Sequence, residues 1–152
     1  MGSVRDFRPV FLVIGILLIT LSLAMMVPAI ADRIAGNPDW QVFLAAAVFS
    51  LFLGGCLTLV SRTSDTRISV RQAFVLTTFS WIIIPAFAAL PFVFGDLGLS
   101  YADAYFEAMS GLTTTGSTVI SDLDNAPPGI LLWRSLLQWM GGIGIIVTAI
   151  AI

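Results

Sequence analysis

Charged residues divide the chain into long uncharged segments. The first three of these segments contain 23, 22 and 24 residues; they lie between Arg8 and Asp32, between Asp39 and Arg62, and between Arg71 and Asp96. Each length matches the roughly 20 apolar residues that a helix needs to cross about 30 Å of hydrocarbon. The pattern therefore predicts three membrane-spanning helices, at residues 9–30, 40–61 and 72–94.

The next uncharged segment is short and polar. Only 14 residues separate Glu107 from Asp122, and they read AMSGLTTTGSTVIS. They are too few to cross a bilayer and too polar to face lipid, so at membrane depth their backbone must be buried in protein or line a wet cavity. After Pro127 and Pro128 the chain has one charge, Arg134, and then 18 uncharged residues. This last segment predicts a fourth spanning helix whose start is set by the proline pair.

The arginines indicate how these helices are oriented. Two arginines precede the first span and three lie in the second connection, whereas residues 95–128 contain neither Lys nor Arg. By the positive-inside rule, the N-terminus and the second connection face the cytoplasm, and residues 95–128 enter from outside. We expect a transmembrane hairpin at residues 1–66 and one helix–re-entrant loop–helix unit at residues 67–152. Because the chain stops inside an apolar helix, we expect it to be the N-terminal part of a longer protein.

The composition agrees with a membrane protein and excludes several functions. Hydrophobic residues make up 58% and charged residues 11% of the 152 residues, and the mean hydropathy is +1.00, whereas a soluble domain is about a quarter charged. A net charge of −2 leaves no basic patch for nucleic acid. The absence of His excludes a Ser-His-Asp triad and a His-ligated zinc site, and a lone Cys56 cannot form an internal disulfide. We therefore expect neither an enzyme nor a nucleic-acid-binding protein.

A short helix is expected just before the polar segment, at residues 100–111. Ser100 and Asp103 have the spacing of a capping box at its start, and Gly111 is a suitable terminator. Because this helix enters from outside, its C-terminal end points toward the membrane centre. That end carries partial negative charge from its unpaired carbonyls and favours a cation there.

The six residues 113–118, TTTGST, have the chemistry of a filter for a dehydrated monovalent cation. Backbone carbonyls supply oxygen ligands of modest field strength if they all turn to one side. Threonine hydroxyls add oxygens without charge, and Gly116 allows torsions that a β-branched residue resists. The alternative is an ordinary polar turn between two helices. The position of these residues, after a re-entrant helix and between two spans, favours the filter.

Arg134 is expected about two turns into the last helix, where a charge is expensive unless it is paired. We favour an ion pair with Glu107 or Asp103 that braces the short helix over electrostatic tuning of a pore. Glu107 and Asp103 could instead concentrate cations at the outer mouth. No buried charge is expected in the leading hairpin, and Gly141, Gly142 and Gly144 are expected to serve close helix packing rather than a hinge.

Two stretches resemble a known family. Residues 105–118, YFEAMSGLTTTGST, resemble the first pore loop of the Trk/Ktr/HKT superfamily of potassium transporters. Residues 123–147 resemble the helix that follows this loop in the bacterial Trk potassium-uptake membrane subunit, which also carries an extra hairpin before its pore unit. The resemblance implies an all-α transmembrane fold with four helix–pore loop–helix repeats around a K+-channel-like pseudo-fourfold pore, of which this chain holds the first.

The resemblance also implies a function and partners. K+ would be the transported ion, with no covalent cofactor, and it would meet filter carbonyls from Thr113, Thr114, Thr115 and Gly116, above all the last three. The setting would be the bacterial inner membrane, with lipid around the helices and three further repeats in the full-length chain. A homodimer and a cytoplasmic nucleotide-binding regulatory subunit are implied as well, and coupling to H+ or Na+ stays open.

Two alternatives to that function remain at this point. The first is a self-contained subunit that contributes one pore loop to a homotetrameric channel. The second is a helical membrane scaffold that transports nothing, in which TTTGST is only a turn. Complementation of potassium uptake separates the scaffold from both transport functions.

Overall fold

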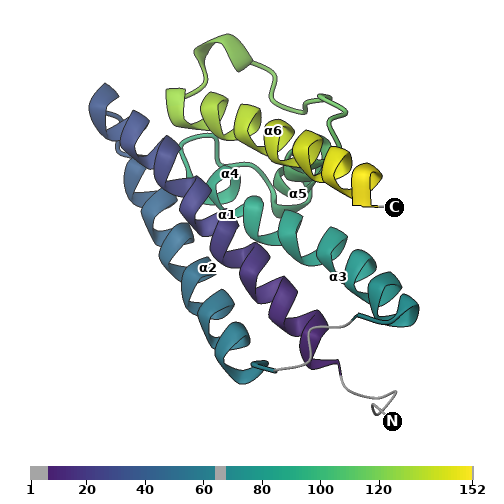
Figure 1. The fold of residues 1–152 in the computed structure, drawn as a ribbon. Coiled ribbons are helices and arrows are strands. Elements are labelled where there is room, and N and C mark those ends of the chain that lie inside the picture. The colour runs from purple at the N-terminus through teal and green to yellow at the C-terminus, as the bar shows by residue number, and fades with distance from the viewer. Residues whose placement is uncertain (1–6, 64–67, 152) are drawn as a thin grey trace.

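The structure, a computed structural model of the 152-residue chain, describes residues 7–63 and 68–151, with side chains as far as residue 144. The described residues are helical and contain no strand, which confirms the all-α class (Figure 1). Their elements are α1 (Arg8–Ala35), α2 (Trp40–Val60), α3 (Val70–Ala88), α4 (Leu90–Phe94), α5 (Tyr101–Leu112), the short 3-10 helix η1 (Leu123–Asn125) and α6 (Pro128–Ala151).

Three helical segments of the described chain are long and apolar enough to cross a membrane. They are α1, α2 and the pair α3–α4, taken together as Val70–Phe94, and they coincide with the three spans expected from the charge gaps. Helix α6 begins at Pro128 and has 24 residues, or about 36 Å at 1.5 Å per residue. Large apolar side chains such as Phe52 and Phe74 stay exposed on the long helices, as expected of surfaces that contact lipid or further protein.

Helices α1 and α2 form a closely packed hairpin. A Cβ atom on Gly54 would lie 2.9 Å from the carbonyl oxygen of Gly15, so a larger residue would force the helices apart. The Ser22 hydroxyl donates to the Ala47 carbonyl at 2.7 Å. Helix α1 ends at Ala35, and the next residue, Gly36, has a φ of 74°, a conformation that glycine adopts without steric strain. The hairpin is therefore a fixed support for the helices that follow.

Pro85 interrupts the third span and creates attachment points for α5 and α6. Proline has no N–H, so the carbonyl four residues earlier, that of Trp81, loses its helical donor. The Tyr105 hydroxyl of α5 donates to this carbonyl at 3.3 Å. Helix α3 ends at Ala88, whose carbonyl accepts the indole N–H of Trp133 in α6 at 3.0 Å. Carbonyls that the broken helix leaves unpaired thus hold the neighbouring helices in place.

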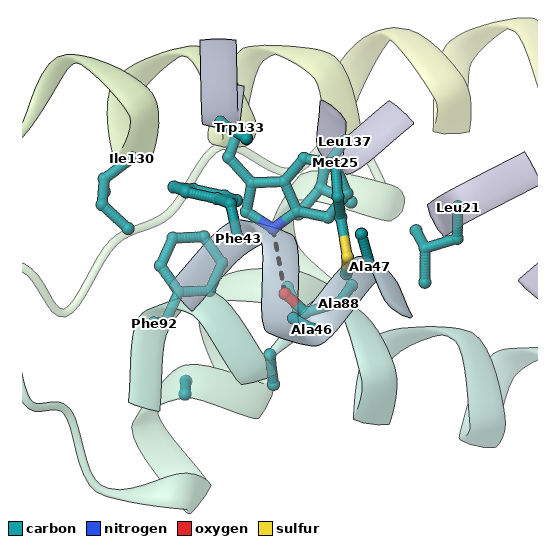
Figure 2. Packing of buried hydrophobic residues seen from close by; sticks show 14 of the residues in the cluster. Leu21, Met25, Phe43, Ala46, Ala47, Ala88, Phe92, Ile130, Trp133 and Leu137 are labelled. Carbon is teal, nitrogen blue, oxygen red and sulfur yellow. Dashed lines mark hydrogen bonds between the residues drawn. The ribbon is translucent and has the colours of Figure 1, made fainter. Parts of the chain in front are cut away.

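The main core lies where the leading hairpin meets α4 and α6. Figure 2 shows Trp133 of α6 at its centre, near Phe43 of α2, Met25 of α1 and Phe92 of α4, with a dashed line to the Ala88 carbonyl. These four large side chains are at most 1% exposed. The rings of Phe43 and Trp133 meet edge to face, with centroids 6.2 Å apart, a favourable aromatic geometry. This core fixes the start of α6 and so one end of the segment that joins α5 to α6.

Candidate functional site

Helix α5 has the N-terminus that its sequence predicts and a different C-terminus. The Ser100 hydroxyl caps the helix: its oxygen accepts the Asp103 N–H at 3.2 Å, and it donates to the Asp103 carboxylate at 2.7 Å. The prediction that Gly111 ends the helix is wrong, because α5 continues through Leu112. Gly111 is buried, and a Cβ there would lie 2.9 Å from the Cβ of Leu137 in α6. This glycine therefore lets two helices approach closely rather than ending one.

The backbone N–H groups of the next residues turn back onto the end of α5. Thr113 donates to the Met109 carbonyl at 2.8 Å, Thr114 to Gly111 at 2.9 Å, and Thr115 to Ser110 at 3.0 Å; Gly116 makes a longer bond of 3.4 Å to Ser110. In a trans peptide the C=O points opposite to the N–H of the same unit, and the described residues contain no cis peptide. The carbonyls of Thr113, Thr114 and Thr115 therefore point away from α5.

Four consecutive carbonyl oxygens in this loop are unpaired. Within the part of the chain that the structure describes, the oxygens of residues 113–116 accept no hydrogen bond. The next carbonyl, that of Ser117, accepts the Ser110 hydroxyl at 2.7 Å. Residues 114–116 are also exposed at the surface of the chain. The loop thus presents a row of free acceptor oxygens, while the N–H groups of the same four residues are already hydrogen-bonded.

Two residues in the loop have left-handed backbone conformations. Thr114 has φ 58° and Gly116 has φ 76°, whereas Thr115 between them has negative φ. A β-branched residue at positive φ is a conformational outlier that costs on the order of 1–3 kcal/mol, and such outliers cluster at functional sites. In a strand, successive carbonyls point to opposite sides. The alternation of positive and negative φ avoids this reversal, so successive carbonyls point to the same side. The row of outward carbonyls depends on it.

The threonine hydroxyls are partly engaged within the loop. The Thr113 hydroxyl donates to the Met109 carbonyl at 2.8 Å and lies 2.8 Å from the Thr115 hydroxyl. Since Thr113 gives its proton to Met109, Thr115 is the donor of the second bond, and its oxygen keeps its lone pairs. The Thr115 hydroxyl therefore adds one more acceptor beside the carbonyl row.

A buried carboxylate holds the chain just after the loop. Glu107 of α5 is 1% exposed. Its Oε1 accepts the Thr118 hydroxyl at 2.5 Å and the Val119 N–H at 2.6 Å, and its Oε2 accepts the Arg134 Nε–H of α6 at 2.9 Å. The structure therefore brings Glu107 and Arg134 together, whereas Asp103 stays at the start of α5. A buried and paired Glu107 does not fit the alternative of a carboxylate that gathers cations at an outer mouth.

Glycines of α6 allow that helix to lie against the loop. A Cβ on Gly141 would collide with the carbonyl oxygen of Leu112, and one on Gly142 would lie 3.9 Å from Cγ2 of Thr114. The expectation of close packing therefore agrees with the structure at Gly141 and Gly142, whereas a Cβ on Gly144 would meet nothing within 4 Å. Among the described residues, no group of three or more His, Cys, Asp or Glu is placed to hold a metal ion. The oxygens that the loop itself offers to a cation are those of its backbone and hydroxyl groups.

The expectation of no buried charge in the leading hairpin is wrong. Asp32 of α1 is 0% exposed, and its Oδ1 accepts the N–H of Gly129 in the first turn of α6 at 2.6 Å, 97 positions away. Asp39 is 3% exposed, and both of its oxygens accept the N–H of Asp96 at 3.1 Å. A Cβ on Gly129 would collide with the Asp32 carboxylate. The hairpin thus holds both the chain that leads into α5 and the start of α6.

One local signal could have revealed the role of Asp32. Helix α6 starts after Ala126 and Pro127, and neither residue can supply the side-chain oxygen that usually caps a helix. Free N–H groups in a buried first turn need an acceptor from elsewhere. An aspartate near the end of an apolar span meets that need and also matches the positive end of the helix dipole.

Replacement of Asp39 by Asn should raise the thermal stability of the protein at neutral pH. Burial raises the pKa of Asp39, the nearby Asp96 charge raises it further, and the Asp96 N–H bond lowers it by less. The raised pKa means that the ionised form opposes folding above this pKa, and that this penalty disappears as the pH falls toward the ordinary aspartate value. Asn retains an oxygen for the Asp96 N–H.

Melting curves in detergent between pH 4 and pH 8 test this prediction. At the upper end of the pH range, wild type should have a lower melting temperature than Asp39→Asn. The difference between the two melting temperatures should narrow as the pH falls. Asp124→Asn, at an exposed aspartate, is the matched control and should follow wild type. A difference between wild type and Asp39→Asn that does not change with pH would contradict the assignment.

Comparison with protein families places most of the chain in one of them. Residues 39–152 match the family model TrkH, described as "Cation transport protein". The Trk system potassium uptake protein TrkI of Halomonas elongata is 37% identical over 150 residues, which cover 99% of this chain and 30% of that protein. The Trk system potassium uptake protein TrkH of Escherichia coli (strain K12) is 36% identical over 147 residues, which cover 96% of this chain and 30% of that protein.

A solved structure has the same fold. The crystal structure of the potassium transporter TrkH from Vibrio parahaemolyticus superposes with a TM-score of 0.91 at 35% identity, and the match covers 97% of this chain and 32% of that one. The chain therefore spans a little under a third of the length of these relatives.

Proposed function

Because this chain belongs to the TrkH family of cation transport proteins, we propose that it supplies the first pore loop of a potassium-uptake protein in the bacterial inner membrane. Potassium would lose its water shell to backbone carbonyls of Thr113, Thr114, Thr115 and Gly116. Three further loops of this kind, in the rest of a longer polypeptide, would complete the ring of ligands. The N-terminus would lie in the cytoplasm.

The row of unpaired carbonyls is the observation that carries this proposal. Residues 114–116 are exposed, so their unpaired carbonyls stay open to a ligand, and oxygens in a row can share one ion. The N–H groups of the same four residues already bond to the end of α5, so these four peptides offer acceptors rather than donors. Neutral carbonyl oxygens in a row suit a dehydrated monovalent cation, which they bind weakly enough to release.

The surroundings of the loop support the same function. Hydrogen bonds from the loop to the C-terminal carbonyls of α5 polarise the outward carbonyls, and the helix dipole adds partial negative charge. Beyond the loop, Glu107 holds Thr118 and Val119, so the segment is fixed at both ends. A filter must be held in this way, because selectivity depends on where its oxygens sit.

The relatives favour a pore built from repeats of one polypeptide over a homotetramer of this chain. They are named as potassium uptake proteins, and this chain covers about 30% of each. Expression of the 152-residue chain alone in a bacterium that lacks potassium uptake tests the alternative, because only a homotetrameric channel would then restore growth at low K+. A scaffold would not restore growth even as the complete gene product. The homodimer and the cytoplasmic nucleotide-binding subunit are part of the same proposal.

Replacement of Gly116 by Ser in the complete gene product should weaken selection of K+ over Na+. Gly116 has φ 76°, and a Cβ there would lie 3.4 Å from Nε2 of Gln138, so a side chain would shift the last carbonyl of the row. Competition of Na+ with K+ or Rb+ uptake in a strain without other potassium systems measures the effect. Gly98→Ser is the matched control, since Gly98 also has positive φ, at 53°, but open space around it. Unchanged ion preference in an abundant Gly116→Ser protein would contradict the filter assignment.

A further inference from the structure

The start of α1 and the end of α2 meet at one end of the leading hairpin (Figure 1). The two helices pack closely near this end, since a Cβ on Gly15 would lie 2.5 Å from the Thr58 hydroxyl oxygen. Arg8 lies about two helical turns before Gly15, and Arg62 about one turn after Thr58. The same packing therefore brings two arginines, 54 positions apart in the sequence, to one end of the hairpin.

An open pocket of about 510 Å³ lies between these helix ends. Among the described residues it is lined by Arg8, Leu12, Arg62 and Thr63, which contribute two guanidinium groups, one apolar side chain and one hydroxyl, and no carboxylate of the described chain lines it. Arg62 forms no ion pair within the part of the chain that the structure describes. The pocket thus combines positive charge with hydrogen-bond donors, and arginine donors of this kind suit the oxygens of a phosphate group.

The position of the pocket along the helices favours a lipid as the source of that phosphate. Arg8 and Arg62 directly flank the apolar spans at residues 9–30 and 40–61, so they lie where hydrocarbon gives way to water. Leu12 lies one turn further into the first span and offers an apolar wall. The 28-residue helix α1 has no side-chain cap at its start, and the partial positive charge of that end adds to the two guanidinium groups.

We propose that this pocket binds the phosphate of an anionic phospholipid in the cytoplasmic leaflet, with Arg8 and Arg62 at the phosphate oxygens and an acyl chain along Leu12. The choice of leaflet rests on the proposed function, which places the N-terminus in the cytoplasm. Basic pockets between transmembrane helices on that side of a membrane suit anionic headgroups. An anion between the two guanidinium groups also offsets their mutual repulsion.

Binding of dioleoylphosphatidylglycerol to the purified complete gene product tests this proposal. Native mass spectrometry during a lipid titration in detergent gives the apparent Kd of the first bound lipid. Arg62→Gln keeps a polar side chain and removes the charge, so it should weaken this binding about five-fold, the effect of one arginine near an anionic surface. Arg62→Lys keeps the charge and should recover most of the affinity. Wild-type affinity in Arg62→Gln would overturn the proposal.

Arg71→Gln is the matched control for Arg62→Gln. Arg71 is also exposed, lies in the first turn of α3, and does not line the pocket. Its replacement changes the net charge by the same amount and should leave the affinity for phosphatidylglycerol unchanged. Equal weakening by Arg71→Gln would overturn the proposal, because the lipid would then respond to total charge rather than to this pocket. If Arg62→Gln does not accumulate, Arg8→Gln removes the other guanidinium group of the pocket and takes its place.

Two further ligands distinguish the sources of the phosphate. Dioleoylphosphatidylcholine has the same chains without net charge, and its binding should be weaker and insensitive to Arg62→Gln. Inorganic phosphate should not displace phosphatidylglycerol from wild type; displacement would assign the pocket to free phosphate and overturn the lipid site. These measurements do not involve potassium, so their outcome is independent of the Gly116→Ser experiment that tests the filter.

Discussion

Replacement of Arg134 by Ala is expected to destabilise the protein by about 3–5 kcal/mol, the usual effect of removing one partner from a buried ion pair. The Glu107 side chain is fully buried and the Arg134 side chain only 14% exposed, so Ala would leave a carboxylate without its counter-charge inside the protein. The same carboxylate holds Thr118 and Val119 beside the loop, so any shift that relieves its unpaired charge would also displace this segment. Potassium uptake should be lost together with stability.

Thermal unfolding in detergent and uptake by cells measure the two effects of Arg134→Ala. The double variant Glu107→Gln with Arg134→Ala should recover part of the stability, because an amide oxygen can still accept the Thr118 and Val119 donors and no charge is left unpaired. Arg33→Ala is the matched control: Arg33 is exposed and lies 4.7 Å over the Trp40 ring, a contact worth about 0.5–1 kcal/mol. Wild-type melting of Arg134→Ala would show that the ion pair does not hold the loop.

Replacement of Gly141 by Ala should abolish potassium uptake although it adds only one methyl group. The new Cβ would collide with the Leu112 carbonyl, which is backbone and cannot move aside as a side chain can. Helix α6 must therefore shift away from α5, and this shift moves Gln138 and Arg134 relative to the loop. Overpacking of this kind costs about 1–3 kcal/mol, so the protein should still fold while the loop is displaced.

Gly55→Ala is the control for Gly141→Ala. Gly55 lies inside α2, and a Cβ there would meet nothing within 4 Å. Its replacement should leave uptake intact and raise stability by up to about 1 kcal/mol through helix propensity. Uptake at wild-type rates by Gly141→Ala would mean that the close contact between α6 and the end of α5 does not matter for transport.

Much of the fold was predictable because it depends on local composition. The three spans follow from the charge gaps, since a charge in hydrocarbon is costly wherever it occurs along a helix. The start of α5 follows from Ser100 and Asp103, and the start of α6 from its prolines, because capping acts within one turn. The loop at residues 113–118 was found in the same way, as a polar stretch too short to span a membrane.

Other features could not be predicted because they depend on residues far apart in the sequence. Gly111 has the local signature of a helix end, but its neighbour Leu137 requires a small residue inside the helix. Asp32 looks like a charge at the edge of a span, and only the fold brings Gly129 to it.

The sequence by itself determined which segments are long and apolar enough to span a membrane and which polar segment is too short to do so, because these follow from hydrophobicity and local capping. The tertiary structure alone decided which groups of that segment are free. Its N–H groups find acceptors at the end of α5, its far end is held by Glu107, and its carbonyls are left without partners. Hydrogen-bond partners across helices depend on packing, and packing is a property of the whole fold rather than of any one stretch of sequence.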